Sequence, residues 1–194
     1  DGTSTQGLTI AQAVNKIRGP KGTQVTINVQ HKNEKASKDI KIIRDVITVK
    51  SIDGDVKKVR DVANVKLEGI LKSNENDEIM YLRLTQFGDN TNKDWTELMN
   101  KLNLKVAGNK NLKGIVLDLR NNPGGYLTDA ACISSEFIKQ GEPVVIQETG
   151  TGERTTLSAQ RRGLFLSQPL VILINKGSAS ASEIVSGAMR DYKR

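Results

Sequence analysis

The stretch GIVLDLRNNPGG, residues 114–125, carries most of the information about the fold. Its first half, residues 114–119, is an apolar run typical of a strand buried on both faces of a sheet. The run ends in a loop in which a proline precedes Gly124 and Gly125. Apolar side chains then recur at helical spacing from Leu127 to Ile138. The stretch therefore predicts a buried strand, a glycine-rich turn and a helix.

The same order of strand and helix recurs on both sides of this stretch. Residues 79–84 predict a strand and residues 94–106 an amphipathic helix. Residues 143–146 and 169–174 predict two further strands, the second of them buried, and residues 181–189 predict a last helix. Strands that alternate with helices indicate an α/β domain with a largely parallel sheet.

The beginning of the chain has a different character. Residues 10–17 predict a short helix, and two alternating stretches around Ile27 and Ile40 predict a hairpin. A helix and a hairpin are too little to bury a core of their own. Residues 45–78 are polar and poorly periodic apart from short strand-like pieces such as residues 46–49, and they predict a connector.

Composition excludes several classes of function. The chain has 194 residues and a formal charge of +7, but its basic and acidic residues are interleaved and only 4% of residues are aromatic, which argues against a nucleic-acid surface. The only histidine, His31, and the only cysteine, Cys132, argue against a zinc site, and Cys132 is expected to be a buried structural thiol. We expect no metal and no cofactor. No apolar run is long enough to span a bilayer, and the first residues carry no signal-peptide pattern.

Two loops could carry chemistry. The loops at residues 120–125 and 175–183 both follow expected strands and lead into expected helices, and sites in α/β sheets form at such strand ends. The two glycines can expose backbone N–H groups to an oxyanion, or they can simply form a strand-to-helix turn. A serine at a helix start can be a nucleophile beside positively polarised amides, or an ordinary N-cap. Neither loop decides between its two interpretations.

The two loops together are more specific than either alone. Residues 117–125, LDLRNNPGG, and residues 177–184, GSASASEI, resemble in sequence and order the two signature blocks of carboxyl-terminal processing (tail-specific) serine proteases. Residues 81–87, YLRLTQF, resemble the strand that precedes them in that family. Residues 1–44 resemble the final third of the PDZ domain found inside such proteases.

The resemblance implies a fold and a division of the chain. The fold would be α/β, with a crotonase/ClpP-like protease core preceded by the C-terminal part of a PDZ domain. Residues 1–44 would be the partial PDZ domain, residues 45–78 the connector of the protease core, and residues 79–194 the core itself, truncated before the catalytic lysine.

The resemblance also implies the site. Ser180 would be the nucleophile, and the backbone N–H groups of Gly125 and Ala181 would form the oxyanion hole. A β-branched residue in place of Gly125 is expected to cost activity far more than stability. The family's general base is a lysine in a later Phe-Gly-Lys-Gly segment, which this sequence does not contain. Lys176 and Lys193 do not match that motif, so we expect residues 1–194 alone to be inactive.

The implied function is that of a serine endopeptidase that cleaves proteins at or near their C-termini through a Ser-Lys dyad and an acyl-enzyme. Its partners would be proteins or peptides with accessible C-termini, with oligomerisation possible and no nucleic acid. The family resemblance places it in the periplasm or cell envelope. Two alternatives are a non-catalytic PDZ-containing peptide-binding scaffold, and a crotonase-like acyl-CoA enzyme, which would not need the serine-centred block at residues 177–183.

Overall fold

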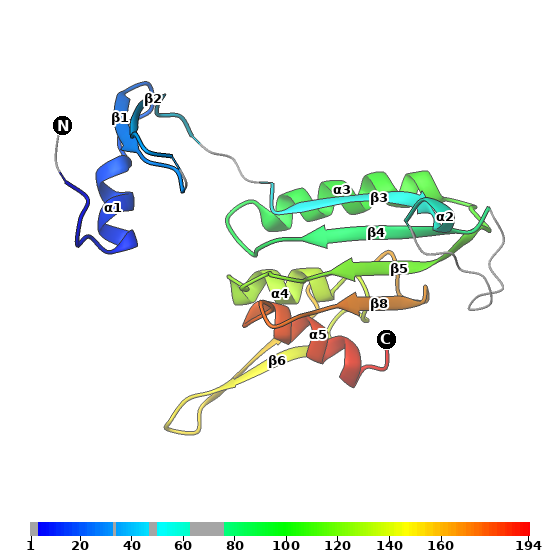
Figure 1. The fold of residues 1–194 in the computed structure, drawn as a ribbon. Helices are drawn as coiled ribbons and strands as arrows, with labels where there is room; N and C mark the ends of the chain where they lie inside the picture. The colour runs from blue at the N-terminus through cyan, green and yellow to red at the C-terminus, as the bar shows by residue number, and fades with distance from the viewer. Residues whose placement is uncertain (1–3, 33, 47–49, 63–75) are drawn as a thin grey trace. The chain divides into compact units, whose positions relative to one another are not determined.

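The structure is a computed structural model that describes residues 4–32, 34–46, 50–62 and 76–194. The chain divides into two compact units, one ending at Val49 and the other beginning at Lys50. Figure 1 traces both units along the chain. No helix in the described ranges is long and apolar enough to cross a membrane.

The first unit contains the expected helix and hairpin. Helix α1 (Ile10–Ile17) is followed by strands β1 (Gln24–Val29) and β2 (Lys38–Ile43), which pair antiparallel. The Arg44 guanidinium ties the hairpin to the helix, because its Nε donates to the Ile17 carbonyl at 2.7 Å. None of the described residues of this unit is buried. This agrees with the expectation that these elements form no core of their own.

The second unit is built on one four-stranded sheet. The sheet consists of β3 (Ile52–Lys58), β4 (Glu78–Leu84), β5 (Leu112–Asp118) and β8 (Leu170–Leu173), in that spatial order. The β3–β4 pair is antiparallel, whereas β4–β5 and β5–β8 are parallel. The predicted mixed α/β domain with a largely parallel sheet is thus confirmed (Figure 1).

Strand β3 lies inside the stretch that the sequence predicts to be a connector, residues 45–78. It pairs with β4 along its whole length, from Ile52 opposite Leu84 to Lys58 opposite Glu78. As an edge strand it buries only one face, so charged residues alternate with the inward-facing ones and conceal the apolar pattern. The predicted strand-like piece at residues 46–49 lies almost wholly outside the described residues.

Helices cover one face of the sheet. They are α3 (Thr91–Val106), α4 (Leu127–Ser134) and α5 (Ala181–Asp191), with the four-residue α2 (Val59–Val62) after β3. The helix predicted to run to Ile138 ends at Ser134 and continues as turns. Many of the fully buried side chains of the core come from β4, β5 and α3: Met80, Leu82, Leu84, Ile115, Leu117, Trp95, Met99 and Leu102. This packing fixes the positions of the carboxyl ends of the strands, and therefore the positions of the loops that follow them.

The opposite face of the sheet is not covered by the described residues. Val116 is only partly buried, and Val171 is 54% exposed. The prediction that residues 114–119 form a strand buried on both faces is therefore wrong for this structure. The strand predicted to be buried at residues 169–174 is only partly buried. An apolar run shows that a strand favours burial on both faces. Which residues cover each face depends on other parts of the polypeptide or on a partner.

The strand predicted at residues 143–146 exists, but it does not join the main sheet. Strand β6 (Pro143–Glu148) pairs antiparallel with β7 (Arg154–Ser158) in a separate hairpin. The hairpin closes where the Thr149 N–H donates to the Glu153 carbonyl at 2.9 Å. Strand β7 was not expected from the sequence, because its polar residues give no strong alternating pattern.

Candidate active site

Three loops meet at the carboxyl ends of β4, β5 and β8. The Ala179 N–H, before α5, donates to the Asn122 carbonyl in the loop after β5 at 3.1 Å. The Phe87 N–H, after β4, donates to the Gly124 carbonyl at 3.0 Å. The structure therefore brings together the two loops that the sequence analysis selected, and the loop after β4 contacts them as a third segment of the site.

Ser180 stands at the start of α5 in an unusual backbone conformation. Its φ is +53° and its ψ is −116°, a region that residues with a side chain rarely occupy. Its N–H donates to the Glu183 carboxylate at 2.7 Å, and the residue is exposed. Nucleophilic serines on sharp strand-to-helix turns have the same kind of strained backbone, which presents the hydroxyl to a substrate. The neighbouring Ala179 lies in the preceding loop and carries no such strain.

The two amides expected to form an oxyanion hole are both unengaged. Within the described parts of the chain, neither the Gly125 nor the Ala181 N–H donates a hydrogen bond to the protein. A Cβ placed on Gly124 would lie 2.8 Å from the Ser180 Cβ and 2.9 Å from the Ala181 nitrogen, so the glycine loop lies directly against the serine. The first turn of α5 adds positive potential at this point. These groups suit a negatively charged oxygen next to Ser180.

The glycine pair is required by space as well as by backbone conformation. Gly124 and Gly125 have φ values of +93° and +144°, in the range that favours glycine. A Cβ on Gly125 would overlap the carbonyl oxygen of Phe87. Replacement of Gly125 must therefore displace backbone. Such a change is therefore expected to cost stability as well, and the prediction that the loss of activity is far larger stays a prediction.

A buried asparagine that the sequence reading missed joins all three loops. Asn122 is fully buried, and its Nδ2 donates to the Leu84 carbonyl at 2.9 Å. Its Oδ1 accepts from the Gly124 N–H at 2.9 Å, and its backbone carbonyl accepts from the Ser182 Oγ at 3.0 Å as well as from Ala179. The sequence did contain a signal for this role, because Asn122 is a polar residue between a buried strand and a glycine turn.

The serines on either side of Ser180 have structural roles, as expected. Ser178 Oγ donates to the Leu119 carbonyl at 2.8 Å and accepts from the Asn175 N–H at 3.0 Å. Ser182 is buried and bonded to Asn122. Their hydroxyls are thus committed to holding the loops together.

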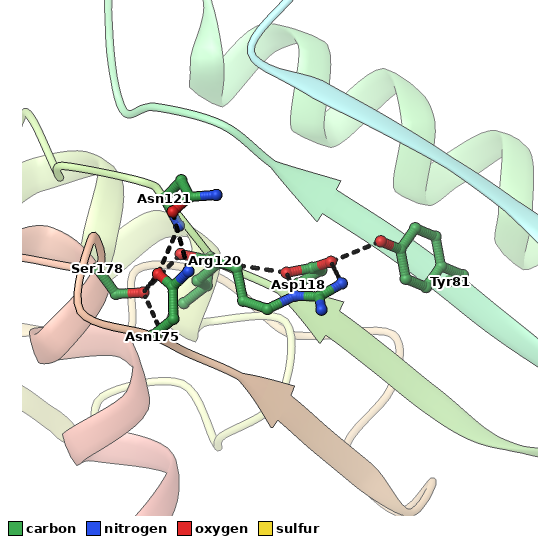
Figure 2. Close-up of polar contacts among 7 residues, drawn as sticks. Tyr81, Asp118, Arg120, Asn121, Asn175 and Ser178 are labelled. Carbon is green, nitrogen blue, oxygen red and sulfur yellow. Dashed lines mark hydrogen bonds and ion pairs between the residues drawn. The ribbon is translucent and has the colours of Figure 1, made fainter.

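A charged network anchors the end of β5 on the open face of the sheet (Figure 2). Asp118 is 2% exposed and accepts from Arg120 Nη2 at 2.6 Å, Arg120 Nε at 2.9 Å and the Arg120 backbone N–H at 3.0 Å. The Tyr81 hydroxyl also donates to Asp118, at 2.6 Å. The Arg120 guanidinium, and then the Tyr81 hydroxyl, lower the pKa of Asp118 despite its burial. The residue before the Asn121–Gly125 loop is therefore rigidly held.

A second buried carboxylate lies in the first turn of α4. Asp129 is 4% exposed, and its Oδ2 has no hydrogen-bond partner among the described residues. Burial raises the pKa of Asp129, and the nearby Asp89 carboxylate acts in the same direction. Asp129 lies next to Gly88 and Asn92 in the loop and first turn that follow β4. Asp129 therefore contacts the segment that follows β4.

The remaining candidate groups do not converge on Ser180. In the described ranges no lysine makes a hydrogen bond to the Ser180 hydroxyl, and both Lys176 and Lys193 are exposed. His31 is an exposed residue of the first unit. Cys132 is buried, and burial raises its pKa, which disfavours the thiolate and agrees with a structural thiol. The described residues contain no group of three or more potential metal ligands of the His, Cys, Asp or Glu type.

Known proteins resemble this chain along its full length. The carboxy-terminal-processing protease of Bartonella bacilliformis is 37% identical over 194 residues, which is 100% of this chain and 40% of that protein. The carboxy-terminal processing protease CtpA of Bacillus subtilis is 30% identical over 191 residues, covering 98% of this chain and 36% of that protein. The chain thus spans well under half the length of these relatives.

A solved structure and a family model agree with these relatives. The structure of a photosystem II D1 C-terminal processing protease superposes with a TM-score of 0.63 at 25% identity, covering 100% of this chain and 47% of that one. The model of peptidase family S41 matches residues 78–194, which include all three loops of the candidate site. On the strength of that match over more than half of its residues, the chain belongs to peptidase family S41.

Proposed function

We propose that the protein is a serine endopeptidase that cleaves proteins at or near their C-termini, with Ser180 as the nucleophile. One observation carries the assignment to this residue: Ser180 has a strained backbone beside two unengaged amides, those of Gly125 and Ala181. Strained backbone and unpaired N–H groups both cost free energy, so their coincidence at one exposed serine favours a functional origin. The names of the relatives supply the reaction class.

The reaction would proceed through an acyl-enzyme. Ser180 Oγ attacks the scissile carbonyl carbon, and the carbonyl oxygen takes the negative charge and accepts hydrogen bonds from the Gly125 and Ala181 N–H groups. The C–N bond then breaks, the amine leaves with the proton that the general base removed from the serine, and water hydrolyses the ester. Each oxyanion donor is worth a factor of about 10²–10³ in turnover in enzymes where one has been removed.

The base would be a lysine that the full-length protein supplies. Serine needs such a partner because its hydroxyl is a weak nucleophile at its free pKa. A lysine serves as a base when burial lowers its pKa far enough to keep it neutral. Lys176 and Lys193 are exposed, whereas such a base has to be buried beside the serine. The resemblance to the family favours a lysine from a Phe-Gly-Lys-Gly segment as the base.

The finer assignments of fold and context belong to the same proposal. The second unit would be a crotonase/ClpP-like core, and residues 1–44 would be the end of a PDZ domain that captures the C-terminal segment of a protein substrate. The helix-and-hairpin unit supports this, because none of its described residues is buried and further strands would be needed to complete a core. The protein would act in the periplasm or cell envelope.

The test uses the full-length protein and a protein substrate with an unstructured C-terminus. We expect Ser180→Ala to lower the cleavage rate by roughly 10⁴–10⁶-fold, as removal of a serine nucleophile does elsewhere, while the circular dichroism spectrum is unchanged. Ser167→Ala, a change at an exposed serine before β8, is the matched control and should cleave normally. A fluorophosphonate probe should label the wild type at Ser180 and should label residues 1–194 alone only slowly.

Two results would contradict the proposed nucleophile or activity, and a third would contradict the proposed base. Cleavage that survives Ser180→Ala would show that another residue is the nucleophile. A full-length wild type that binds C-terminal peptides but neither cleaves them nor reacts with the probe would be the non-catalytic scaffold. Rapid labelling of residues 1–194 alone would place the base within these residues and return Lys176 and Lys193 to consideration.

A further inference from the structure

Two asparagines join the loop after β5 to the loop after β8 through a reciprocal pair of hydrogen bonds (Figure 2). The Asn121 backbone N–H donates to Asn175 Oδ1 at 2.8 Å, and Asn175 Nδ2 donates to Asn121 Oδ1 at 2.9 Å. One asparagine precedes Gly125 by four residues, and the other precedes Ser180 by five. The pair therefore bridges the two segments that would have to cooperate in catalysis.

Each partner is also fixed within its own loop. Asn175 Oδ1 accepts a second hydrogen bond, from the Gly177 N–H at 3.0 Å, and the Asn175 N–H donates to Ser178 Oγ. Asn121 has a φ of +60°, a left-handed conformation that asparagine tolerates better than most residues. Both positions thus favour asparagine for local reasons and for the contact between the loops.

A close approach of the two loops is visible independently at Gly177. A Cβ on this residue would lie 2.9 Å from Asn121 Oδ1 and 3.0 Å from the Asn121 Cα. The backbone of Gly177 does not have a positive φ, so an alanine would be compatible with its conformation. Glycine is needed here because the neighbouring loop fills the space where a side chain would stand.

The two connections between the loops differ in burial. Asn122 is buried and makes its bonds in the core, so it contributes mainly to stability. Asn121 and Asn175 are both exposed, and an exposed hydrogen bond contributes little to the free energy of folding, because water replaces it when it is lost. An exposed pair can nevertheless set the separation of two loops to a fraction of an ångström, which matters for catalysis.

We infer that Asn121 and Asn175 are positioning residues of the proposed reaction, which hold the Gly125 amide at its working distance from Ser180 and the Ala181 amide. This inference rests on the proposed function of that site. Neither asparagine needs to touch substrate. Their loss would displace the oxyanion donors from the nucleophile and would lower turnover more than substrate affinity.

The two side chains play unequal parts, which gives a sharp test. The Asn121 side chain only accepts within the pair, so Asn121→Asp preserves its hydrogen bond. The Asn175 side chain both accepts and donates. Asn175→Asp therefore loses the donor and places a carboxylate oxygen against Asn121 Oδ1. The same chemical change should be tolerated at one position and harmful at the other.

The kinetic experiment uses the full-length protein and separates kcat from KM. We expect Asn175→Asp and Gly177→Ala each to lower kcat by roughly 10–100-fold, the scale of a misplacement of about 1 Å, with KM within about twofold of the wild type. Asn121→Asp should keep kcat within about threefold of the wild type, since its bond survives. Asn100→Asp on the exposed side of α3 and Gly187→Ala in α5, where a Cβ meets nothing within 4 Å, are the matched controls.

Hydrogen exchange on the same samples tests the coupling of the loops without reference to activity. Asn175→Asp and Gly177→Ala should speed amide exchange in both loops, residues 119–126 and 174–181, and leave the core strand β4 unchanged. If a variant fails to fold, Asn121→Gly takes its place, because it suits the left-handed backbone and removes only the acceptor. It should lower kcat in the same way.

The outcomes distinguish this inference from the proposed function. Wild-type kcat and wild-type exchange in Asn175→Asp would overturn the inference, and so would an effect confined to KM. An equal loss of kcat in Asn121→Asp and Asn175→Asp would also overturn it, because the hydrogen-bond asymmetry would then have no role. A wild type that neither cleaves nor is labelled at Ser180 would refute the proposed function, and faster exchange in both loops of Asn175→Asp would then still support the coupling of the loops.

Discussion

At the scale of single residues, the candidate site brings together several backbone conformations that are costly for residues with a side chain. Ser180, Asn121 and the adjacent Gly124 and Gly125 all have positive φ values within the two contacting loops. Such conformations cost about 1–3 kcal/mol each for residues with a side chain, so the surrounding contacts must stabilise them. Glycine avoids that cost at two of the four positions, but Ser180 does not, which indicates that its side chain is needed there.

The packing of Gly125 leads to a prediction about stability. Gly125→Ala should destabilise the second unit by about 1–3 kcal/mol, because the new Cβ overlaps the Phe87 carbonyl and the φ of +144° disfavours a side chain. Gly187→Ala should instead be neutral or stabilise by about 0.5–1 kcal/mol, since it is a helical position with free space. Denaturant unfolding of both variants measures the difference. Equal stability of the two variants would show that the loop after β4 can move away from the new Cβ at little cost in free energy.

At the scale of elements, β5 and the loop that follows it form one pre-arranged piece. Asp118 binds the side chain and backbone of Arg120, and two residues later Asn122 fixes the glycine turn to the end of β4. Two buried polar side chains with all their main partners present therefore lie on opposite sides of Asn121. The loop is short and bonded at both ends, which suits a site that must not rearrange during reaction.

The Asp118 network predicts a dependence of stability on pH. Asp118→Ala should destabilise the second unit by about 1–3 kcal/mol at neutral pH, because it leaves the partly buried Tyr81 hydroxyl without its acceptor. The loss of the hydrogen bonds from Arg120 adds little, because its exposed guanidinium is solvated by water. Since the pKa of Asp118 is lowered on folding, its contribution is complete above the ordinary aspartate pKa of about 3.9 and is lost as pH falls below that value.

Unfolding by denaturant at pH 7 and at pH 3 checks this sign. The difference between wild type and Asp118→Ala should shrink at the lower pH. Tyr81→Phe removes one hydrogen bond and leaves the ion pair, so it should cost only about 1 kcal/mol at pH 7. A difference for Asp118→Ala that grows towards pH 3 would mean that the carboxyl is held protonated rather than charged.

At the scale of the whole molecule, the two units differ greatly in burial. The first unit has no buried residue in its described part, whereas the second has a continuous core around β4, β5 and α3. Burial of apolar surface supplies most of the free energy of folding, so local opening should be far easier in the first unit. The partition of the chain at Val49 is therefore also expected to be a partition in stability.

Amide hydrogen exchange on residues 1–194 measures that difference. Amides of β1 and β2 should exchange at least roughly 10³-fold faster than those of Leu82 in β4 and Leu117 in β5, a difference of about 4 kcal/mol in opening free energy. The β6–β7 hairpin, which lies outside the main sheet, should fall between them. Protection of β1 and β2 equal to that of β4 would show that the first unit is stabilised by contacts beyond its own residues.

Much of this structure follows from the sequence alone. Apolar periodicity predicted α1, α3, β4, β5 and α5 because each element has a regular apolar face. That face is buried in all of them except α1, which has no buried residue. The sequence also placed Ser180 and Gly125 at strand ends and assigned the buried thiol and the structural serines. The catalytic roles that the sequence suggests for Ser180, Gly125 and Ala181 stay predictions.

Tertiary structure decided what short-range patterns do not encode. The pairing of Asn121 with Asn175, and the contact of Gly124 with Ser180, join residues more than 50 positions apart, and only the parallel β5–β8 pair brings them together. The membership of β3 in the sheet and the separate β6–β7 hairpin likewise depend on strand partners elsewhere in the chain. A sequence pattern specifies which face an element must bury, whereas the partner that covers this face is chosen by packing across the whole unit.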